Sequence, residues 1–382
     1  MRICHVSPHL PPDQAANALL PAQLGQWLTA RGDRVSYVAH EPGQTSVGAG
    51  PGPAGNIRWI PRRGSAGSIQ RLLRLDAWRI ARQVTRALND TASDADLLHL
   101  HSNGWIIEVA AAWAKRRRKP YVLTLYGTEI WHYRPRRPID PFTRAYQAAS
   151  GVTFYSERLR ARAKELGLDR ADLSVIYPPV SESFTPIDNA TRDAWRTELG
   201  IREAQVVLNV KRLHPLAGQQ FLIDAFARIA RHRRDVRLII CGAGELREAL
   251  ERQAQTAGVA QAVTFTGLIP NETIARFMAV ADVFVLPSRL EAMPTVAVEA
   301  LASGTPVISA DHPGGLELSA MFGDDVAIVP REQVEPLADA LRAFLGQPRR
   351  ARLETAARLA ARFRPPAVLA GFDAVYQKAR RR

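Results

Sequence analysis

The sequence predicts an α/β protein made of two units, each built around a parallel sheet. Short runs rich in β-branched and apolar residues alternate with helical patterns through both halves, an arrangement typical of right-handed crossovers between parallel strands. The 382 residues exceed the length of one typical domain. A proline-rich segment at 177–186, YPPVSESFTP, interrupts the alternation as an interdomain linker does. We therefore expect a first unit over 1–182 and a second over 183–364.

Five strand patterns occur in the first half. They are RICHVS at 2–7, RVSYVAH at 34–40, DLLHLHS at 96–102, YVLTLYG at 121–127 and GVTFYS at 151–156. The segment PAQLGQWLTARG at 21–32 predicts a helix that begins at Pro21 and stops at Gly32, because proline is favoured in the first turn and glycine at the end. Glycine and proline dominate 41–56, which predicts a loop.

Six strand patterns occur in the second half, again alternating with helical segments. They are VVLNV at 206–210, VRLIICG at 236–242, AVTFTG at 262–267, DVFVLPS at 282–288, TPVISA at 305–310 and DVAIVP at 325–330. This regular alternation predicts a second parallel sheet.

Composition is that of an ordinary globular protein, with 46% hydrophobic and 23% charged residues. The net charge of +14 favours anionic partners such as phosphorylated substrates, anionic lipid or nucleic acid, and an arginine-rich composition bias is the alternative explanation. Nucleic acid is the least favoured partner and we expect none, because the charge is scattered apart from 115–119 and 68–90.

Cys4 and Cys241 each lie in a strand pattern, which predicts buried thiols rather than a disulfide or a cysteine metal site. No window reaches the roughly 18 apolar residues of a membrane-spanning helix. The first ten residues contain no apolar signal core. We therefore expect a cytoplasmic protein.

The segment 68–90 forms a helical pattern with two different faces. The apolar face consists of Ile69, Leu72, Leu73, Ile80, Val84 and Ala87. The opposite face consists of Arg71, Arg74, Arg82 and Arg86, with Leu75 and Trp78 between them. A solvated basic face is one interpretation. The alternative is a surface that contacts anionic lipid or a lipid-linked anion, which would make the protein peripheral at the inner face of a membrane.

Two acids lie eight positions apart in the otherwise apolar segment 282–304. Glu291 follows a strand, at the carboxyl edge where α/β sheets bind ligands. Glu299 falls inside a helix among apolar neighbours, and a buried acid needs hydrogen-bond donors. Two ribose hydroxyls would supply them, and the first amides of the helix would bind phosphate. A structural role in caps or salt bridges is the alternative.

The spacing of these acids, followed by ALASGTPVIS, resembles the signature of retaining glycosyltransferase family 4. The resemblance extends through VKRLHPLAGQQFLIDAF, LIICGAGELREAL, VTFTGLIP and ADVFVLPS, and so covers nearly all of 205–330. It continues more weakly through LLHLHS, LTLYGTE and VIYPPV in the first half. The resemblance implies the GT-B fold, in which two Rossmann-like domains face a cleft. It also implies that a last helix, 365–382, crosses back to complete the first domain.

The family's residue roles imply a site for a nucleotide-sugar donor. Glu299 would bind the nucleotide ribose, and Arg212 would clamp the diphosphate. Glu291, with the backbone of Met293, Pro294 and Thr295, would hold the donor sugar and its phosphates. The base would pack near Leu268 and Ile269.

Two departures from the family affect this site. The paired glycines before the first helix are Ala15 and Ala16 here, followed by Asn17. Alanine keeps the amide that approaches the phosphate but tolerates a positive φ poorly, so we expect Ala16 and Asn17 to bind the donor through a different loop. Tyr126 stands where many relatives have a histidine that contacts the donor sugar, and its hydroxyl still donates one hydrogen bond.

We count Tyr126 among the catalytic residues with Arg212 and Glu291; a tyrosine packed at the sheet edge is the alternative. His101 and His132 are further candidates, for which a structural role is favoured.

A third departure concerns Ala217, five positions after Arg212. The family places a lysine of the diphosphate clamp at this position, immediately before Gly218. One interpretation is natural divergence, with another cation such as Lys211 in its place. The favoured interpretation is a deliberate substitution that arrests the enzyme with its donor bound. Because the clamp lacks this ammonium, we expect the chain to bind its nucleotide sugar but to transfer the sugar very slowly.

Other cofactor chemistries fit the sequence poorly. In CGAGE at 241–245 the third glycine of the dinucleotide fingerprint is replaced by Arg247. The sequence contains no phosphate-binding loop of the nucleoside triphosphatases and no His/Asp cluster at metal-ligand spacing. We expect no cofactor and no metal, because arginine, lysine and helix dipoles would neutralise the leaving diphosphate.

The sequence therefore predicts a retaining hexosyltransferase that uses a nucleotide diphosphate sugar. The segment EAMPTV at 291–296 is closer to family members that use UDP-sugars than to the EGFG form common among GDP-mannose users. The expected acceptor is a saccharide or a lipid-linked hydroxyl. Two alternatives stay open, a GDP-mannose-dependent mannosyltransferase and a catalytically silent nucleotide-sugar-binding protein.

Overall fold

The chain forms two compact units. The computed structural model describes residues 1–13, 16–42, 53, 55–62, 75–134 and 140–381. Unit 1 comprises Met1–Tyr177 and Val368–Arg382, and unit 2 comprises Pro178–Ala367. The expected boundary at 182 lies five residues later than this division. The linker belongs to unit 2 because the Val180 N–H donates to the Phe363 carbonyl at 2.8 Å.

Unit 1 contains a seven-stranded parallel sheet in the order β3-β2-β1-β4-β5-β6-β7. Its strands are β1 (Arg2–Ser7), β2 (Arg34–His40), β3 (Asn56–Ile60), β4 (Leu97–His101), β5 (Tyr121–Leu125), β6 (Gly151–Phe154) and β7 (Leu173–Val175). The order reverses between β1 and β4. Such a switch point is where the carboxyl ends of parallel strands bind ligands.

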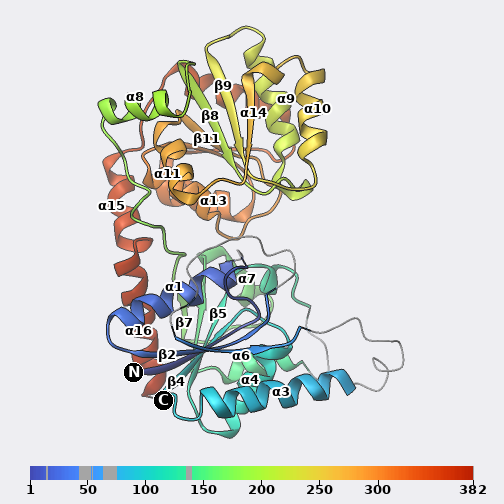
Figure 1. Ribbon diagram of the computed structural model, residues 1–382, viewed down its shortest axis with the longest axis vertical. Helices are drawn as coiled ribbons and strands as arrows, with labels where there is room; N and C mark the ends of the chain where they lie inside the picture. Colours follow the sequence, from blue (N-terminus) through green and yellow to red (C-terminus); the bar gives the residue numbers. More distant parts are fainter. Residues whose placement is uncertain (14–15, 43–52, 54, 63–74, 135–139, 382) are drawn as a thin grey trace. The chain divides into compact units, whose positions relative to one another are not determined.

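Helices cover both faces of this sheet (Figure 1). They are α1 (Ala16–Ala30), α3 (Leu75–Thr91), α4 (Trp105–Arg116), α5 (Thr128–Trp131), α6 (Pro141–Ala148), α7 (Glu157–Glu165) and α16 (Pro365–Arg380). One apolar core joins α3, α4 and α6 to the sheet, and α4 lies between the other two. A second core joins α1 and α16 to the opposite face.

Helix α1 begins earlier than the sequence predicts. It starts at Ala16, so Pro21 lies inside it rather than in its first turn. A proline has no N–H to donate to the carbonyl four residues before it. The hydroxyl of Ser7 donates to that carbonyl, the Asn17 oxygen, at 2.6 Å. The bond from β1 therefore satisfies the acceptor that Pro21 leaves open.

Two strands of unit 1 have no counterpart in the sequence prediction. Strands β3 and β7 form the two edges of the sheet. Edge strands bury fewer side chains, and β3 alternates exposed with partly buried residues while β7 has only three residues. Neither carries the apolar run by which the central strands are recognised.

The last helix, α16, packs on unit 1. Its apolar face buries Val368, Phe372, Tyr376 and Ala379 against α1 and the sheet. Tyr376 also reaches a buried histidine of β4, His99, through its hydroxyl.

Unit 2 contains a six-stranded parallel sheet in the order β10-β9-β8-β11-β12-β13. Its strands are β8 (Gln205–Val210), β9 (Val236–Cys241), β10 (Val263–Gly267), β11 (Val283–Leu286), β12 (Val307–Ala310) and β13 (Val326–Val329). All six strand patterns of the second half are confirmed. The order reverses between β8 and β11, as it does between β1 and β4 in unit 1.

Helices of unit 2 lie between these strands, before β8 and after β13. They are α8 (Asn189–Glu198), α9 (Gln219–Ala230), α10 (Arg247–Thr256), α11 (Asn271–Val280), α12 (Thr295–Ala302), α13 (Pro313–Phe322), α14 (Val334–Gly346) and α15 (Leu353–Arg362). A core between the sheet and α9, α10 and α14 covers one face. Both cysteines are buried and free, as predicted. Among the described helices, none combines the length and apolar content that crossing a bilayer requires.

Candidate functional site

An ion pair occupies the switch point of unit 2. Lys211 directly follows β8, and Glu291 lies in the loop between β11 and α12. Lys211 Nζ lies 2.5 Å from Glu291 Oε1, and the two side chains are 29% and 16% exposed. Both charges stay accessible from the carboxyl edge of the sheet. Sequence reasoning named Lys211 only as a substitute cation and did not foresee this pair.

Arg212 places a second cation beside Lys211. Its side chain is exposed and has no carboxylate partner among the residues that the structure describes. The Arg212 carbonyl accepts a hydrogen bond from Gln219 Nε2 at 3.2 Å, which fixes the backbone at this point. An unpaired guanidinium at a sheet edge is suited to an anionic ligand, because its planar fork matches phosphate oxygens.

Two glycines after β9 hold the backbone of this cationic loop. A Cβ at Gly242 would lie 2.1 Å from the Lys211 oxygen, and one at Gly244 would lie 2.2 Å from the Leu213 oxygen. Only glycine allows the two loops to approach so closely. The CGAGE segment therefore supports the loop that carries Lys211 and Arg212.

Glu299 is an acid without a partner inside unit 2. It lies on α12, and its carboxylate makes no hydrogen bond or ion pair with the described residues. Burial raises the pKa of Glu299 to about 7. The carboxylate would regain favourable contacts if a ligand offered hydroxyl donors, which matches the sequence argument for this residue.

The loop that carries Glu291 is held by α13. The Gly314 N–H donates to the Glu291 carbonyl at 2.9 Å. A Cβ at Gly314 would lie 2.7 Å from Pro294 Cδ, so this contact requires glycine. His312 caps α13 by accepting from the Gly315 N–H at 2.9 Å, and burial lowers its pKa to about 4. The HPGG segment gave no signal of this role in the sequence.

The other predicted donor residues of unit 2 also lie at loops that leave the carboxyl edge. Met293 is buried and Pro294 directly precedes α12, whose first residue is Thr295. No side chain caps that helix, which leaves its first amides to other acceptors. Ile269 lies between β10 and α11, next to the exposed Leu268.

Position 217 is buried. Ala217 ends a short 3₁₀ turn, Pro215–Ala217, and is 3% exposed. Gly218 follows with a positive φ, and a Cβ there would lie 2.1 Å from the Pro287 oxygen. A long side chain at position 217 would have to extend past this tight packing.

A hydrogen-bonded cluster lies at the switch point of unit 1. His5 on β1 and His101 on β4 are fully buried, and His5 Nδ1 lies 2.9 Å from His101 Nε2. His101 Nδ1 lies 2.7 Å from the hydroxyl of Tyr126, which directly follows β5. His99 bonds to the hydroxyls of Tyr376 and Thr124 at 2.7 and 2.6 Å.

Nitrogens of the three histidines lie within 4.8 Å of one another, close enough to consider a metal. The sequence showed no such cluster, because His5 lies on a different strand from the other two. Both nitrogens of His99 and of His101 already have hydrogen-bond partners. A metal would have to displace these bonds, so the residues fit a hydrogen-bond network better.

The remaining predicted residues of unit 1 are spread over two helices. Asn17 lies in the first turn of α1, where its carbonyl accepts from Ser7. Ala16 begins that helix, but its side chain and all of Ala15 lie outside the described residues. His132 directly follows α5.

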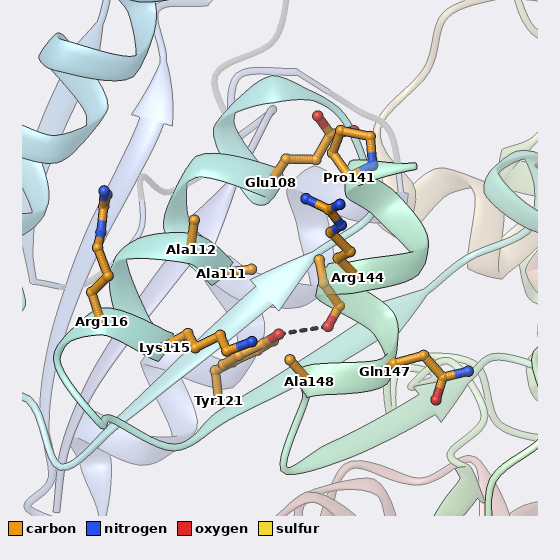
Figure 2. Close-up of a pocket in the computed structure, with 11 residues that line it drawn as sticks. Glu108, Ala111, Ala112, Lys115, Arg116, Tyr121, Pro141, Arg144, Gln147 and Ala148 are labelled. Carbon is orange, nitrogen blue, oxygen red and sulfur yellow. Dashed lines mark hydrogen bonds between the residues drawn. The ribbon is translucent and has the colours of Figure 1, made fainter. Parts of the chain in front are cut away.

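A groove of about 750 Å³ lies elsewhere on unit 1, between α4 and α6 (Figure 2). Its floor includes Tyr121, whose hydroxyl donates to the Ala145 carbonyl. Tyr121 begins β5, so the groove lies toward the opposite sheet edge from Tyr126. Lys115, Arg116 and Arg144 line the groove, and none has a carboxylate partner in the part of the chain that the structure describes.

Two family models match the chain, one in each unit. Residues 22–184 match the model described as Glycosyltransferase Family 4. Residues 191–360 match the model described as Glycosyl transferases group 1. Together these matches cover all strands of the second sheet and all strands of the first except β1.

Curated relatives match part of the chain. A GDP-mannose-dependent alpha-(1-6)-phosphatidylinositol monomannoside mannosyltransferase of Mycolicibacterium smegmatis is 35% identical over 53% of this chain and 55% of its own. A D-inositol 3-phosphate glycosyltransferase of Jonesia denitrificans is 36% identical over 47% of this chain and 44% of its own. The chain spans about half the length of these curated relatives.

A solved structure matches the whole chain. The Anabaena protein Alr3699/HepE, solved with UDP and glucose, aligns with a TM-score of 0.75 over 99% of both chains at 20% identity. A likeness at this identity concerns the fold alone. With two Rossmann-like parallel sheets, it confirms the predicted GT-B fold.

The raised pKa of Glu299 predicts that ionisation of this carboxyl lowers the free energy of unfolding, by an amount that depends on pH. Because its folded-state pKa of about 7 exceeds the ordinary value of 4.5, the ionised form is disfavoured in the folded state. The cost is absent below about pH 4.5 and complete above about pH 7. Replacing Glu299 by Gln should therefore raise the free energy of unfolding at pH 8 by on the order of 2 kcal/mol, and by little at pH 4.5. Urea denaturation at the two pH values measures it.

The matched control for this measurement is Glu291→Gln. Its carboxylate has Lys211 as a partner, so neutralising it should not stabilise unit 2 at pH 8. A Glu299→Gln variant with the same stability difference at both pH values would contradict the assignment of an unpartnered, partly buried carboxylate.

Proposed function

Because the chain belongs to the family 4 glycosyltransferases, we propose that it transfers a hexose from a nucleotide diphosphate donor to an acceptor hydroxyl with retained anomeric configuration. The observation that carries this proposal is the grouping of Lys211, Arg212, Glu291 and Glu299 around the switch point of unit 2. It joins two cations suited to a diphosphate with an unpartnered acid suited to a diol.

Each part of the donor has a matching group at this edge. The carboxylate of Glu299 accepts hydrogen bonds from two ribose hydroxyls, which removes the cost of its burial. Arg212 and the uncapped start of α12 bind the diphosphate. Glu291, with the backbone at 293–295, holds the sugar. Ile269 lies in the loop that contacts the base.

The proposed reaction is a substitution on the same face of the sugar. The acceptor oxygen forms a bond to the anomeric carbon as the bond from that carbon to the β-phosphate oxygen breaks. The departing β-phosphate takes the proton of the acceptor hydroxyl, so the step needs no protein base. Arg212 stabilises the negative charge that develops on the diphosphate. Lys211 adds a second positive charge at the same edge.

Two donor classes are supported by different observations. The EAMPTV segment favours a UDP-sugar. The curated relative of Mycolicibacterium smegmatis is named for GDP-mannose, which supports a mannosyltransferase as the second candidate. A catalytically silent nucleotide-sugar-binding protein would keep the same residues and lack turnover.

The proposed acceptor is a saccharide or a lipid-linked hydroxyl, presented at an anionic membrane surface. The apolar face of α3 is packed into unit 1 through Ile80, Val84 and Ala87. Its opposite face exposes Trp78, with the Arg82 guanidinium 5.4 Å from the ring. The part of this face predicted at 68–74, and the side chain of Leu75, lie outside the described residues.

The neighbouring helices extend this basic surface. Helix α4 packs beside α3 and ends in Lys115 and Arg116, and α6 contributes Arg144 at the groove of Figure 2. Cations next to an exposed tryptophan are typical of a surface that contacts lipid headgroups.

A thermal-shift panel tests the donor site. UDP-glucose, GDP-mannose, ADP-glucose and dTDP-glucose are compared, and a true donor at 100 times its Kd should stabilise the protein by about 2.7 kcal/mol. The Glu299→Ala variant should lose most of this shift, because it lacks the ribose acceptor. A protein that no nucleotide sugar stabilises would contradict the proposal. Binding without donor hydrolysis or transfer would instead support the silent binding protein.

Position 217 predicts a gain of activity. Ala217→Lys should raise kcat at least about tenfold, because one preorganised donor to a developing anion contributes about 10²–10³ in rate. Steady-state transfer at saturating donor measures this. The matched control is Ala217→Met, which has similar length and no charge. A lysine variant no faster than the methionine variant would show that position 217 lies outside the diphosphate site.

The basic face of α3 predicts binding to anionic vesicles. Each arginine near an anionic bilayer contributes about 1 kcal/mol, and salt screens the attraction. Sedimentation with phosphatidylserine vesicles at low salt should recover the protein, whereas Arg82→Glu with Arg86→Glu should reduce recovery several-fold. The control is Arg231→Glu with Arg234→Glu, the same charge change on exposed residues of unit 2. Equal recovery on neutral and anionic vesicles would leave only a solvated face.

A further inference from the structure

A chain of hydrogen bonds connects the core of unit 1 to the hydroxyl of Tyr126. The Tyr126 oxygen lies 2.7 Å from His101 Nδ1, and His101 Nε2 lies 2.9 Å from His5 Nδ1. Both histidines are fully buried, whereas Tyr126 is partly exposed at the carboxyl end of β5. The chain therefore begins in the core and ends at the edge of the sheet.

Two proton arrangements are compatible with these distances. Burial lowers the pKa of His5 to about 3 and that of His101 well below its ordinary value, so each ring is neutral and carries one N–H. In the inward arrangement, Tyr126 donates to His101 Nδ1, His101 Nε2–H donates to His5 Nδ1, and His5 keeps its hydrogen on Nε2. In the outward arrangement, His5 Nδ1–H donates to His101 Nε2, and His101 Nδ1–H donates to the Tyr126 oxygen.

The unpaired end of the chain decides between them. His5 Nε2 is buried and has no hydrogen-bond partner among the described residues. The inward arrangement would leave an N–H there without an acceptor, and orphaned buried N–H groups are rarer than acceptors short of a donor, as backbone surveys show. The outward arrangement leaves only a lone pair there. It transfers the unbonded donor to Tyr126, whose side chain is partly exposed.

We infer that His5 and His101 fix Tyr126 as an outward hydrogen-bond donor for a hydroxyl or ring oxygen of the substrate sugar. The inference rests on the proposed function and on the expectation from the sequence that Tyr126 contacts the donor sugar. His5 and His101 are positioning residues, because they act on the sugar only through the phenol. Their role is to occupy the acceptor side of the Tyr126 oxygen, so that its hydrogen points away from the core.

His99 provides a control within the same cluster. It is fully buried, and its ring lies 3.9 Å from that of His101. Its nitrogens bond to Tyr376 and Thr124 instead of to Tyr126. Replacing His99 therefore disturbs the same core without removing a hydrogen bond of the chain that ends at Tyr126.

The first test measures the protons directly in the ligand-free protein. Two-dimensional ¹⁵N spectra of histidine-labelled protein, assigned with His5→Phe and His101→Phe, report which ring nitrogen carries hydrogen. The inference expects Nδ1–H on both His101 and His5. A hydrogen on Nε2 of His101 would overturn it, as would displacement of both signals by one equivalent of Zn²⁺. This result does not depend on any substrate.

The second test separates the contribution of the sugar to binding from that of the nucleotide. Calorimetry compares UDP-glucose with UDP, and GDP-mannose with GDP. Both Tyr126→Phe and His101→Phe should weaken the nucleotide sugar about three- to tenfold while leaving the nucleoside diphosphate nearly unchanged, since one hydrogen bond to the sugar is lost. In the Tyr126→Phe background, His101→Phe should add no further loss. His99→Phe should leave the ratio of the two affinities unchanged.

A conservative variant shows whether the weaker binding comes from the lost hydrogen bond or from a general loss of structure. His101→Asn keeps an N–H close to the position of Nδ1 and should retain most of the preference for the nucleotide sugar. If neither nucleotide pair binds, the proposed function fails and the tautomer measurement alone decides the inference. If nucleotide sugars bind but His101→Phe and His99→Phe change the affinity ratio equally, the inference is wrong and the proposed function stands.

Discussion

The parallel pairing of β8 with β11 is the contact on which the candidate donor site depends. The register places Val207 opposite Val283 and Leu208 opposite Phe284. Because the strands are parallel, the loops that follow them leave at the same edge, and Lys211 meets Glu291 there. The pairing of β1 with β4 does the same in unit 1, where His5 stands opposite His99. In both units the central reversal of strand order determines which side chains can interact.

Close backbone contacts at three glycines hold the loops that carry these side chains in place. Gly242 and Gly244 let the loop after β9 press on the backbone of 211–213, and Gly314 lets α13 press on the Glu291 loop. A methyl group at any of the three would push one of these loops away. The ligand-facing side chains are therefore held by backbone contacts from neighbouring loops, which is how a rigid sheet positions residues that lie on connections.

The sequence predicted the fold well where apolar runs are long. All six strands of unit 2 and the Glu291–Glu299 spacing were recognisable, because both depend on residues close together in the chain. The edge strands β3 and β7 were missed because they bury few side chains. The ion pair of Lys211 and the chain from His5 to Tyr126 depend on strand order, which a local pattern does not contain. The start of α1 was predicted too late, at Pro21. The Ser7 hydroxyl of β1 replaces the N–H that proline lacks, and a local pattern does not show this bond.

The two switch points differ in how they can recognise a ligand. That of unit 2 presents Lys211 and Arg212 with two carboxylates, and charges of this kind bind a diphosphate strongly because its own charge is high. The hydrogen-bonded cluster at the switch point of unit 1 consists of imidazoles and hydroxyls, and burial keeps its members His5 and His101 uncharged. A sugar has no charge, and hydroxyl recognition depends on which partner donates and which accepts. A neutral chain whose donor direction is fixed from the core therefore suits the sugar, whereas a cationic edge suits the leaving group.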